Sequence, residues 1–438
     1  MYSINISLFA KIAAGFSLVF STIPIFCFND SLHTKSIYLI FIFIFVMFSV
    51  FLNRGWSFWK NGLLIIYVCF FIYSITYYVV IDSLINTVFY KLNNQASFLI
   101  TYYTFICLSF FCLTIINFFH LKETETNSKY RLNISVLALF CMSIIELLFI
   151  YPVITHYSIL MNAASRIEVQ EAIAPISFPY IKQLITGVLI YQTIYLFSSK
   201  TNSQGMMKLL IFPLYTIAMY FLVKLGMRKE LLIICIATLL FHSNRINDKK
   251  FIMLCVMFVF SLLLLGDLRQ PAQDKDSINI INVIGEFFFS HSTLPFVVTK
   301  PEIMDDGPIP YLNTLFVFIP KIITGGMPEV SYTLSDFFRD KLIGFDNMGF
   351  GFSPLAEAYL CSKDFSWLIL SIICVCYALV IKNIFCTNKL ISIVLIATLP
   401  NFMRVDFRSY FIETLIIILV IAGMAYISRC KIIMNKVL

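Results

Sequence analysis

The chain has 438 residues, of which 60% are hydrophobic and 13% are charged, and its formal net charge is +8. Soluble globular domains average about 25% charged residues, so this composition excludes a soluble protein and predicts an all-α polytopic integral membrane protein. The positive charge does not indicate nucleic acid binding, because the Lys and Arg residues lie mostly in short segments between apolar stretches, where they set topology.

Apolar stretches of about 20 residues, bounded by polar clusters, predict about twelve membrane spans within one membrane domain, residues 1–438. The predicted spans cover residues 8–28, 37–52, 63–81, 98–119, 132–154, 180–197, 209–223, 231–241, 251–265, 365–381, 390–402 and 410–427. A large loop, residues 267–364, separates the ninth span from the tenth.

Cationic residues are distributed unevenly between the two sides that these spans define. The segments on the side of the termini carry fifteen Lys and Arg residues, and the short segments on the other side carry nine. The nine are Lys35, Lys91, Arg166, Lys182, Lys224, Arg228, Lys229, Arg404 and Arg408. Because cytoplasmic loops are enriched in Lys and Arg, both termini are expected in the cytoplasm and the large loop outside.

The large loop contains two shorter apolar patterns. Residues 311–319 are too few to span a membrane and are expected to form an interfacial or re-entrant piece. Residues 333–342 alternate apolar and charged positions at helical spacing. Its apolar face, Phe337, Phe338 and Leu342, is expected against the membrane, and its polar face, Asp336, Arg339 and Lys341, against water. A loop of this length is usually functional, and here it would form a lid over the outer face.

The loop ends on a glycine-rich stretch, residues 349–359, placed just before an apolar run. Gly349 and Gly351 free the backbone for a tight turn or a close approach to a ligand. Pro354 suits the first turn of a helix, with Glu357 one turn in and Tyr359 beside it. The stretch fits either a plain helix start, where an acidic residue is favourable, or a functional carboxylate at the mouth of a span.

Arginines on the outer side form the second candidate group. Arg404 and Arg408 flank Asp406 in a short turn, Arg228 precedes the eighth span, and Arg269 opens the loop. Arg404, Arg408 and Arg228 are among the nine that oppose the topology bias, so they either bind an anion or simply reach lipid headgroups or neighbouring acids. Within predicted spans, Glu146 and Glu413 are the acidic side chains considered as functional, with a hydrogen bond to a neighbouring helix as the alternative for Glu146.

The cysteines and the known nucleotide or metal motifs do not define a site. Most of the twelve Cys lie in apolar runs, and Cys374-Val375-Cys376 has no neighbouring His, so neither a metal nor a redox centre is expected. No GxxxxGK[ST], HExxH or GxSxG motif is present. We therefore expect no cofactor.

The layout of about twelve spans and one large outer loop resembles the Wzy-type O-antigen polymerases, or oligosaccharide repeat-unit polymerases. Residues 349–359 are similar to the glycine-rich segment with Ala-Glu and Tyr that precedes a late span in that family. Gly226-Met227-Arg228-Lys229-Glu230 is similar to its Gly-Lys-Arg turn, although here the Lys follows the Arg and a Met intervenes.

The resemblance implies a GT-C-like membrane glycosyltransferase of lipopolysaccharide biosynthesis in the bacterial inner membrane. Its substrates would be undecaprenyl-diphosphate-linked glycans, which it would join on the periplasmic face with release of undecaprenyl diphosphate. A chain-length regulator protein would be a possible partner. Two other functions stay open: an O-antigen ligase, with the same donor and lipid A core as acceptor, and a lipid-linked oligosaccharide flippase, against which the long loop counts. A structural membrane protein is the remaining alternative.

The candidate residues suit this chemistry. A diphosphate leaves without a general acid, but its developing charge needs stabilisation, which the guanidinium groups of Arg228, Arg269, Arg404 and Arg408 can supply. The acceptor hydroxyl needs a carboxylate base, for which Glu357 is the first choice and Asp406 the second. Tyr359 would stack on or hydrogen-bond to a sugar, and Gly349 and Gly351 would admit the ligand.

Overall fold

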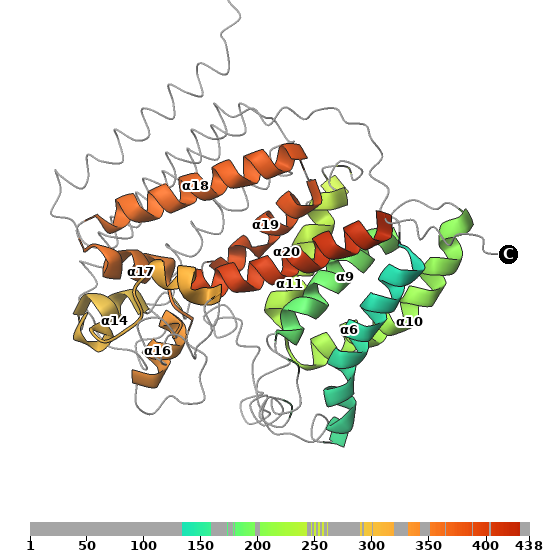
Figure 1. Ribbon diagram of the computed structural model, residues 1–438, viewed down its shortest axis with the longest axis horizontal. Helices are drawn as coiled ribbons and strands as arrows, with labels where there is room; N and C mark the ends of the chain where they lie inside the picture. Colours follow the sequence, from blue (N-terminus) through green and yellow to red (C-terminus); the bar gives the residue numbers. More distant parts are fainter. Residues whose placement is uncertain are drawn as a thin grey trace, which may run out of the picture. The chain divides into compact units, whose positions relative to one another are not determined.

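The computed structural model describes residues 134–158, 180–197, 202–242, 293–299, 301–318, 332–341, 351–363, 365–387, 389–402 and 404–429, together with a few isolated residues (Figure 1). Every regular element within these ranges is a helix. The predicted spans at residues 8–28, 37–52, 63–81 and 98–119 lie outside them, as does most of the one at 251–265.

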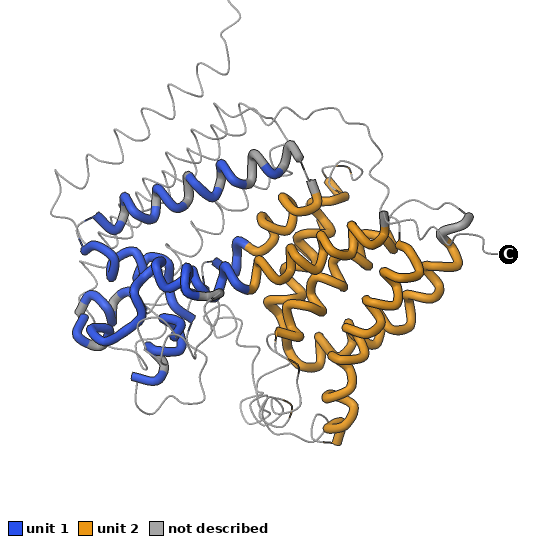
Figure 2. The backbone as a smooth tube through the Cα atoms, viewed as in Figure 1, with its two compact units in different colours: residues 1–122, 281–387, 399–412 blue, residues 123–280, 388–398, 413–438 orange. Residues whose placement is uncertain are grey.

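The chain divides into two compact units, which are coloured separately in Figure 2. Unit 1 comprises residues 1–122, 281–387 and 399–412, and unit 2 comprises residues 123–280, 388–398 and 413–438. Helices α19 (Lys389–Phe402) and α20 (Phe407–Arg429) contribute residues to both units.

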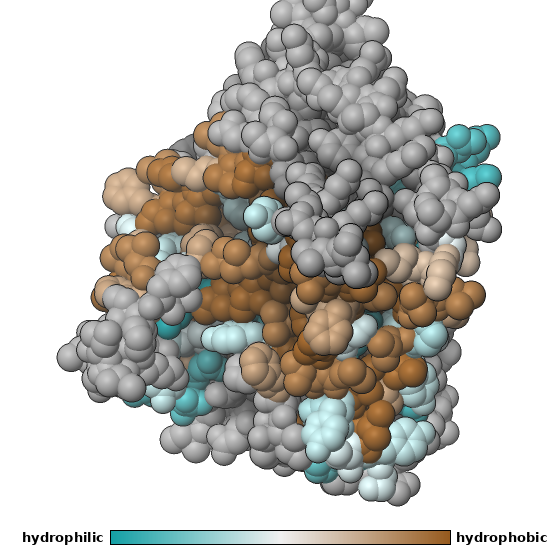
Figure 3. All heavy atoms as spheres, turned by 45° about the vertical axis from the view of Figure 1, so that its right-hand side comes forward, coloured by the Kyte–Doolittle hydropathy of each residue, from teal (hydrophilic) through white to brown (hydrophobic). Residues whose placement is uncertain are grey.

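Three helices of the described residues are long and apolar enough to cross a membrane, namely Val136–Thr155, Gly205–Lys224 and Phe407–Ser428. Two shorter apolar helices cover Ile181–Phe197 and Leu390–Phe402. Each of the five lies where the sequence predicts a span: the three longer helices are candidate spans, and the two shorter ones confirm an apolar helix at those positions. On the face shown in Figure 3, apolar side chains occupy much of the coloured surface, as expected of helices that meet lipid.

Unit 2 is built around α9 (Ile181–Phe197), which packs against α6 (Val136–Thr155) and α11 (Arg228–His242). Gly187 of α9 lies where an added Cβ would be 2.9 Å from the Cβ of Val420 on α20, so the glycine permits this close helix approach. Glu146 of α6 is 1% exposed and lies beside Gln192 of α9. Its functional role stays a prediction.

The turn between α10 (Asn202–Lys224) and α11 has a specific backbone geometry. Gly226 has a φ of 64°, Met227 N–H donates to the Leu222 carbonyl at 3.1 Å, and Gly226 N–H donates to the Val223 carbonyl at 2.9 Å. This is the Schellman arrangement that ends a helix at a glycine. The Gly226–Glu230 stretch therefore combines a helix end with the start of α11, whose first residue is Arg228.

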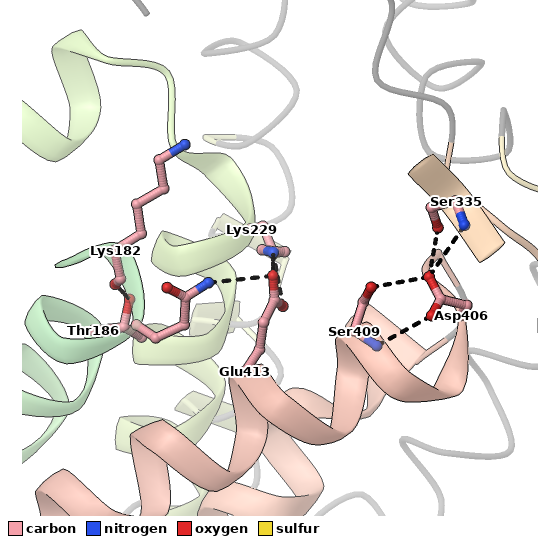
Figure 4. Close-up of polar contacts among 8 residues, drawn as sticks. Lys182, Thr186, Lys229, Ser335, Asp406, Ser409 and Glu413 are labelled. Carbon is pink, nitrogen blue, oxygen red and sulfur yellow. Dashed lines mark hydrogen bonds and ion pairs between the residues drawn. The ribbon is translucent and has the colours of Figure 1, made fainter. Parts of the chain in front are cut away.

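A polar cluster joins three helices of unit 2 (Figure 4). The Lys229 ammonium group on α11 donates to both carboxylate oxygens of Glu413 on α20, at 2.7 and 2.8 Å. Gln183 on α9 donates to the same carboxylate at 3.3 Å. Lys229, one of the nine cations predicted on the outer side, thus has an acidic partner.

Unit 1 contains α14 (Thr293–Thr299), the 3₁₀ helices η6 (Pro301–Met304) and η7 (Leu312–Phe318), α16 (Leu334–Lys341), α17 (Pro354–Cys361) and α18 (Ser366–Thr387). α17 packs against both α14 and α18. The short apolar run predicted at residues 311–319 contains the 3₁₀ helix η7, which begins at Leu312. The predicted helix at residues 333–342 is confirmed as α16.

The expectation that Phe337 and Phe338 lie on the membrane is wrong. Phe338 is 1% exposed, with its ring 5.9 Å from Phe296 and 5.7 Å from Phe352, and Phe337 is also buried. An apolar helix face can be buried against a protein core as well as against lipid, so the sequence pattern could not distinguish these two environments. Lys341 is exposed, as expected, and Leu342 lies outside the described residues.

The Lys229–Glu413 pair gives a first prediction. Lys229→Met and Glu413→Gln should each lower the thermal stability of the purified protein, because each leaves one partly buried charge without its partner. The double variant should lose less than the sum of the two, with a coupling of about 1 kcal/mol for a half-buried pair. Strictly additive losses in melting measurements would show that the pair does not stabilise unit 2.

Candidate functional site: two buried carboxylates in unit 1

Glu357 lies on α17, which begins immediately after the glycine-rich stretch. Ser353 caps this helix, with its hydroxyl accepting from the Leu355 N–H at 3.2 Å, and Pro354 is its first residue. Glu357 is 0% exposed. Its Oε1 accepts from the Tyr311 N–H at 3.0 Å, and its Oε2 accepts from the Phe407 N–H at 2.7 Å.

Asp406 is the residue immediately before α20 and caps that helix (Figure 4). Its Oδ2 accepts from the Ser409 N–H at 3.2 Å, the bond expected of an N-cap carboxylate. Its Oδ1 accepts from the hydroxyl groups of Ser335 at 2.7 Å and Ser409 at 2.9 Å, and from the Ser335 N–H at 3.4 Å. Asp406 is also 0% exposed.

The two carboxylates lie where three helices begin. Tyr311 precedes η7, Ser335 is the second residue of α16, and Phe407 is the first residue of α20. The first N–H groups of a helix have no partner within it and carry partial positive charge, so a carboxylate both satisfies and neutralises them. Glu357 links η7 to α20, and Asp406 links α16 to α20.

Burial perturbs both acids. It raises the pKa of Glu357 from 4.5 to about 8, the negative charge of Asp406 adds to this shift, and the Phe407 and Tyr311 N–H groups oppose it. Burial also raises the pKa of Asp406, against the hydrogen bonds from Ser335 and Ser409. Glu357 therefore exchanges its proton close to neutral pH, which is the range useful to a general base.

Gly351 of the glycine-rich stretch contacts the arginine turn, which is the turn formed by residues 404–408. A Cβ added to Gly351 would lie 1.8 Å from the Arg404 carbonyl oxygen and 2.8 Å from the Ser290 Cβ. No other residue type fits at this distance. Contact between two backbone segments is thus enough to explain the glycine, and its proposed role in admitting a ligand stays a prediction.

The arginines differ in their surroundings. Arg408 is 8% exposed, and its Nη1 donates to the Tyr332 carbonyl at 3.3 Å. Arg404 is half-buried in the turn before Asp406. Arg228 is 7% exposed at the start of α11, which belongs to unit 2.

The structure brings together Gly351, Glu357, Arg404, Asp406 and Arg408, five of the nine predicted site residues. Tyr359 is half-buried on α17, and two residues along a helix correspond to a rotation of about 200°, so it leaves α17 on another side from Glu357. Arg269 and Gly349 lie outside the described residues.

The residues that hold the two carboxylates are not among the predicted site residues; they are Tyr311, Ser335, Phe407 and Ser409. Asp406-x-x-Ser409 has the spacing of a helix N-cap and could have identified one contact. Tyr311 has a positive φ of 56°, which is unusual for a residue other than glycine and is not signalled by the sequence. Among the residues that the structure describes, no group of three His, Cys, Asp or Glu side chains could hold a metal ion.

Comparison of the chain with protein-family models, with curated proteins and with solved structures gives no match.

Gly351→Ala tests the backbone contact with Arg404. The added methyl group overlaps a carbonyl oxygen, so the variant should melt several degrees below the parent, for a cost of about 1–3 kcal/mol. Gly423→Ala is the matched control, because its added Cβ on α20 meets no atom within 4 Å among the described residues beyond its own stretch of helix. Equal melting temperatures for both variants would contradict the contact.

Glu357 also predicts how stability depends on pH. The folded protein binds this proton more tightly than the unfolded chain, because the pKa rises from 4.5 to about 8 on folding. Protonation thus favours the folded state, and stability should fall as pH rises from about 4.5 to about 8. In Glu357→Gln the contribution is absent, so its melting temperature should vary less over this range. The same pH profile in both proteins would mean that folding does not shift the pKa of Glu357.

Proposed function

We propose that this protein is an O-antigen polymerase, a membrane glycosyltransferase that joins undecaprenyl-diphosphate-linked oligosaccharide repeat units. The observation that supports this proposal most is the convergence in unit 1 of residues 351–357 and 404–408. Both stretches were singled out by their chemistry, and Gly351 meets the Arg404 carbonyl while Glu357 accepts from the Phe407 N–H.

In the proposed reaction, the bond between the anomeric carbon of the donor glycan and its diphosphate oxygen breaks. The same carbon bonds to a hydroxyl oxygen of the acceptor repeat unit, whose proton passes to a carboxylate. Undecaprenyl diphosphate leaves with the bonding electron pair. The two requirements on the protein are stabilisation of the diphosphate charge and acceptance of one proton.

Arg404 and Arg408 are proposed to meet the first requirement. They lie on either side of Asp406, and guanidinium groups donate in pairs to phosphate oxygens while remaining charged at every accessible pH. Arg408 is largely removed from water, which strengthens its attraction for an anion. Arg228 and Arg269 stay predicted contributors.

Glu357, rather than Asp406, is the proposed general base. Each of its oxygens accepts one N–H bond, so each retains one lone pair for a sugar hydroxyl. The Oδ1 of Asp406 already accepts three bonds, which leaves that oxygen little capacity. A pKa near 8 also makes Glu357 a stronger proton acceptor than an ordinary carboxylate.

The wider architecture is part of the proposal. It comprises about twelve spans in a GT-C-like arrangement, the loop of residues 267–364 on the periplasmic side of the inner membrane, and both termini in the cytoplasm. The apolar helices described above are compatible with a bilayer. A chain-length regulator is the proposed protein partner.

The lipopolysaccharide ladder of a deletion strain tests the proposed function. Loss of a polymerase leaves a single repeat unit on the lipid A core, and the parent gene restores the ladder. Core without repeats, with polymer retained on undecaprenyl diphosphate, would instead identify a ligase. Core without repeats, with single units trapped in the cytoplasmic leaflet, would identify a flippase.

The arginines can be tested in the same strain. Arg404→Lys and Arg408→Lys keep the positive charge but lose paired donation, so both should shorten the ladder or lower its yield, and the Ala variants should abolish it. Lys341→Ala is the control, because this exposed cation of α16 lies outside the proposed site. Ladders of parental length from the Arg variants, at equal protein levels in the membrane, would exclude a role in diphosphate binding.

A further inference from the structure

The N-terminal end of α16 contacts the arginine turn at two points. Ser335 donates its hydroxyl and its N–H to Asp406 Oδ1, across 71 residues of sequence. The Tyr332 carbonyl, just before the helix, accepts from Arg408 Nη1, across 76 residues. One short segment of the large loop thus holds both the acid and one of the arginines.

α16 is oriented for these contacts by its own packing. The Thr333 hydroxyl accepts from the Asp336 N–H at 3.1 Å and donates to the Asp336 carboxylate at 2.8 Å, which defines where the helix begins. Phe338 follows Ser335 by three residues, on the same side of the helix, and is buried against Phe296 and Phe352. Asp340 and Lys341 are exposed. The polar contact of Ser335 and the apolar contact of Phe338 therefore face the same way.

The two serines that bind Asp406 are not equivalent. Ser409 belongs to the helix that Asp406 caps, and its N–H also donates to Oδ2, so losing its hydroxyl leaves the local cap in place. Ser335 comes from the loop, and its 2.7 Å hydroxyl bond is the shortest contact between α16 and Asp406. Removing that hydroxyl weakens the connection of α16 to the turn without altering the turn itself.

We propose that Ser335 is a positioning residue for the transfer reaction: it seats α16 on Asp406, so that the Tyr332 carbonyl orients the Arg408 guanidinium for a polyprenyl diphosphate. This inference rests on the proposed function and adds to it a loop residue that determines donor binding. Ser335 acts through Asp406 and Arg408 and does not itself contact the substrate.

Binding of farnesyl diphosphate to the purified full-length protein in nanodiscs tests the inference without requiring turnover. Ser335→Ala removes the hydroxyl bond that seats α16 on Asp406, so Arg408 is less well oriented and the affinity should fall by about tenfold. Ser335→Thr keeps the hydroxyl and should recover most of the affinity. Ser409→Ala should lose distinctly less than Ser335→Ala. Ser366→Ala removes a buried hydroxyl at the start of α18 and serves as the unchanged control.

Turnover with the lipid-linked repeat unit provides the second readout. Ser335→Ala should raise the KM for the donor more than it lowers kcat, because the variant weakens donor binding while Glu357 is untouched. Melting temperatures should accompany each variant. A lower melting temperature for Ser335→Ala with parental affinity would mean that the serine only stabilises the fold, and would overturn the inference.

The outcomes separate this inference from the proposed function. Parental protein that binds farnesyl diphosphate, with equal affinity in Ser335→Ala, would reject the positioning role and leave the function standing. Parental protein that binds no polyprenyl diphosphate at all would reject both. Equal losses of affinity in Ser335→Ala and Ser409→Ala would show that both serines act only by hydrogen-bonding to Asp406. The position of α16 would then not affect donor binding, and the inference would be rejected.

Discussion

The arrangement of unit 1 depends on two carboxylates placed at the starts of three helices. Each helix start presents N–H groups that must find acceptors away from water, and Glu357 and Asp406 supply them for η7, α16 and α20. An unsatisfied buried N–H costs about 1–3 kcal/mol, so these contacts hold distant segments of the chain in one place. The same contacts bury two acids close to each other, which raises their proton affinity. The hydrogen bonds that stabilise unit 1 and the raised pKa of the proposed base thus have the same structural origin.

This double role changes how substitutions at Glu357 are interpreted. From the sequence, a carboxylate at the start of a helix contributes about 0.3–1 kcal/mol, so Gln would be nearly neutral for folding. In the structure both oxygens accept N–H bonds, and an amide nitrogen cannot replace either of them. A loss of function in Glu357→Gln is informative only when the stability of the variant is measured alongside it.

Apolar periodicity and helix-end chemistry were enough to predict much of the described fold. Residues 180–197 were predicted as a span and form α9 from Ile181 to Phe197, because an apolar run of this length has few other solutions. The helix at Leu334–Lys341 was predicted in the same way, but the direction of its apolar face was wrong, since Phe338 packs on Phe296 and Phe352. Local pattern specifies a helix, but whether lipid or protein covers it depends on contacts distant in sequence.

The candidate site shows the same limit. Glu357, Asp406 and the two arginines that flank Asp406 were identified individually, because charged residues near membrane spans are costly and few. Their meeting depends on Gly351 against the Arg404 carbonyl, on Tyr311 at a positive φ and on Ser335 from a loop helix. None of these contacts has a local sequence signature, since each joins segments separated by dozens of residues.

In the proposed function, this site transfers glycans from a lipid diphosphate. The most direct measurement supplies the purified protein, in liposomes, with undecaprenyl-diphosphate-linked repeat units alone and follows both products. We expect polymers of several repeat units, with one undecaprenyl diphosphate released for each bond formed, and neither product from a protein that carries Ala at both Arg404 and Arg408. Release without polymer, or equal polymer from the double variant, would contradict it.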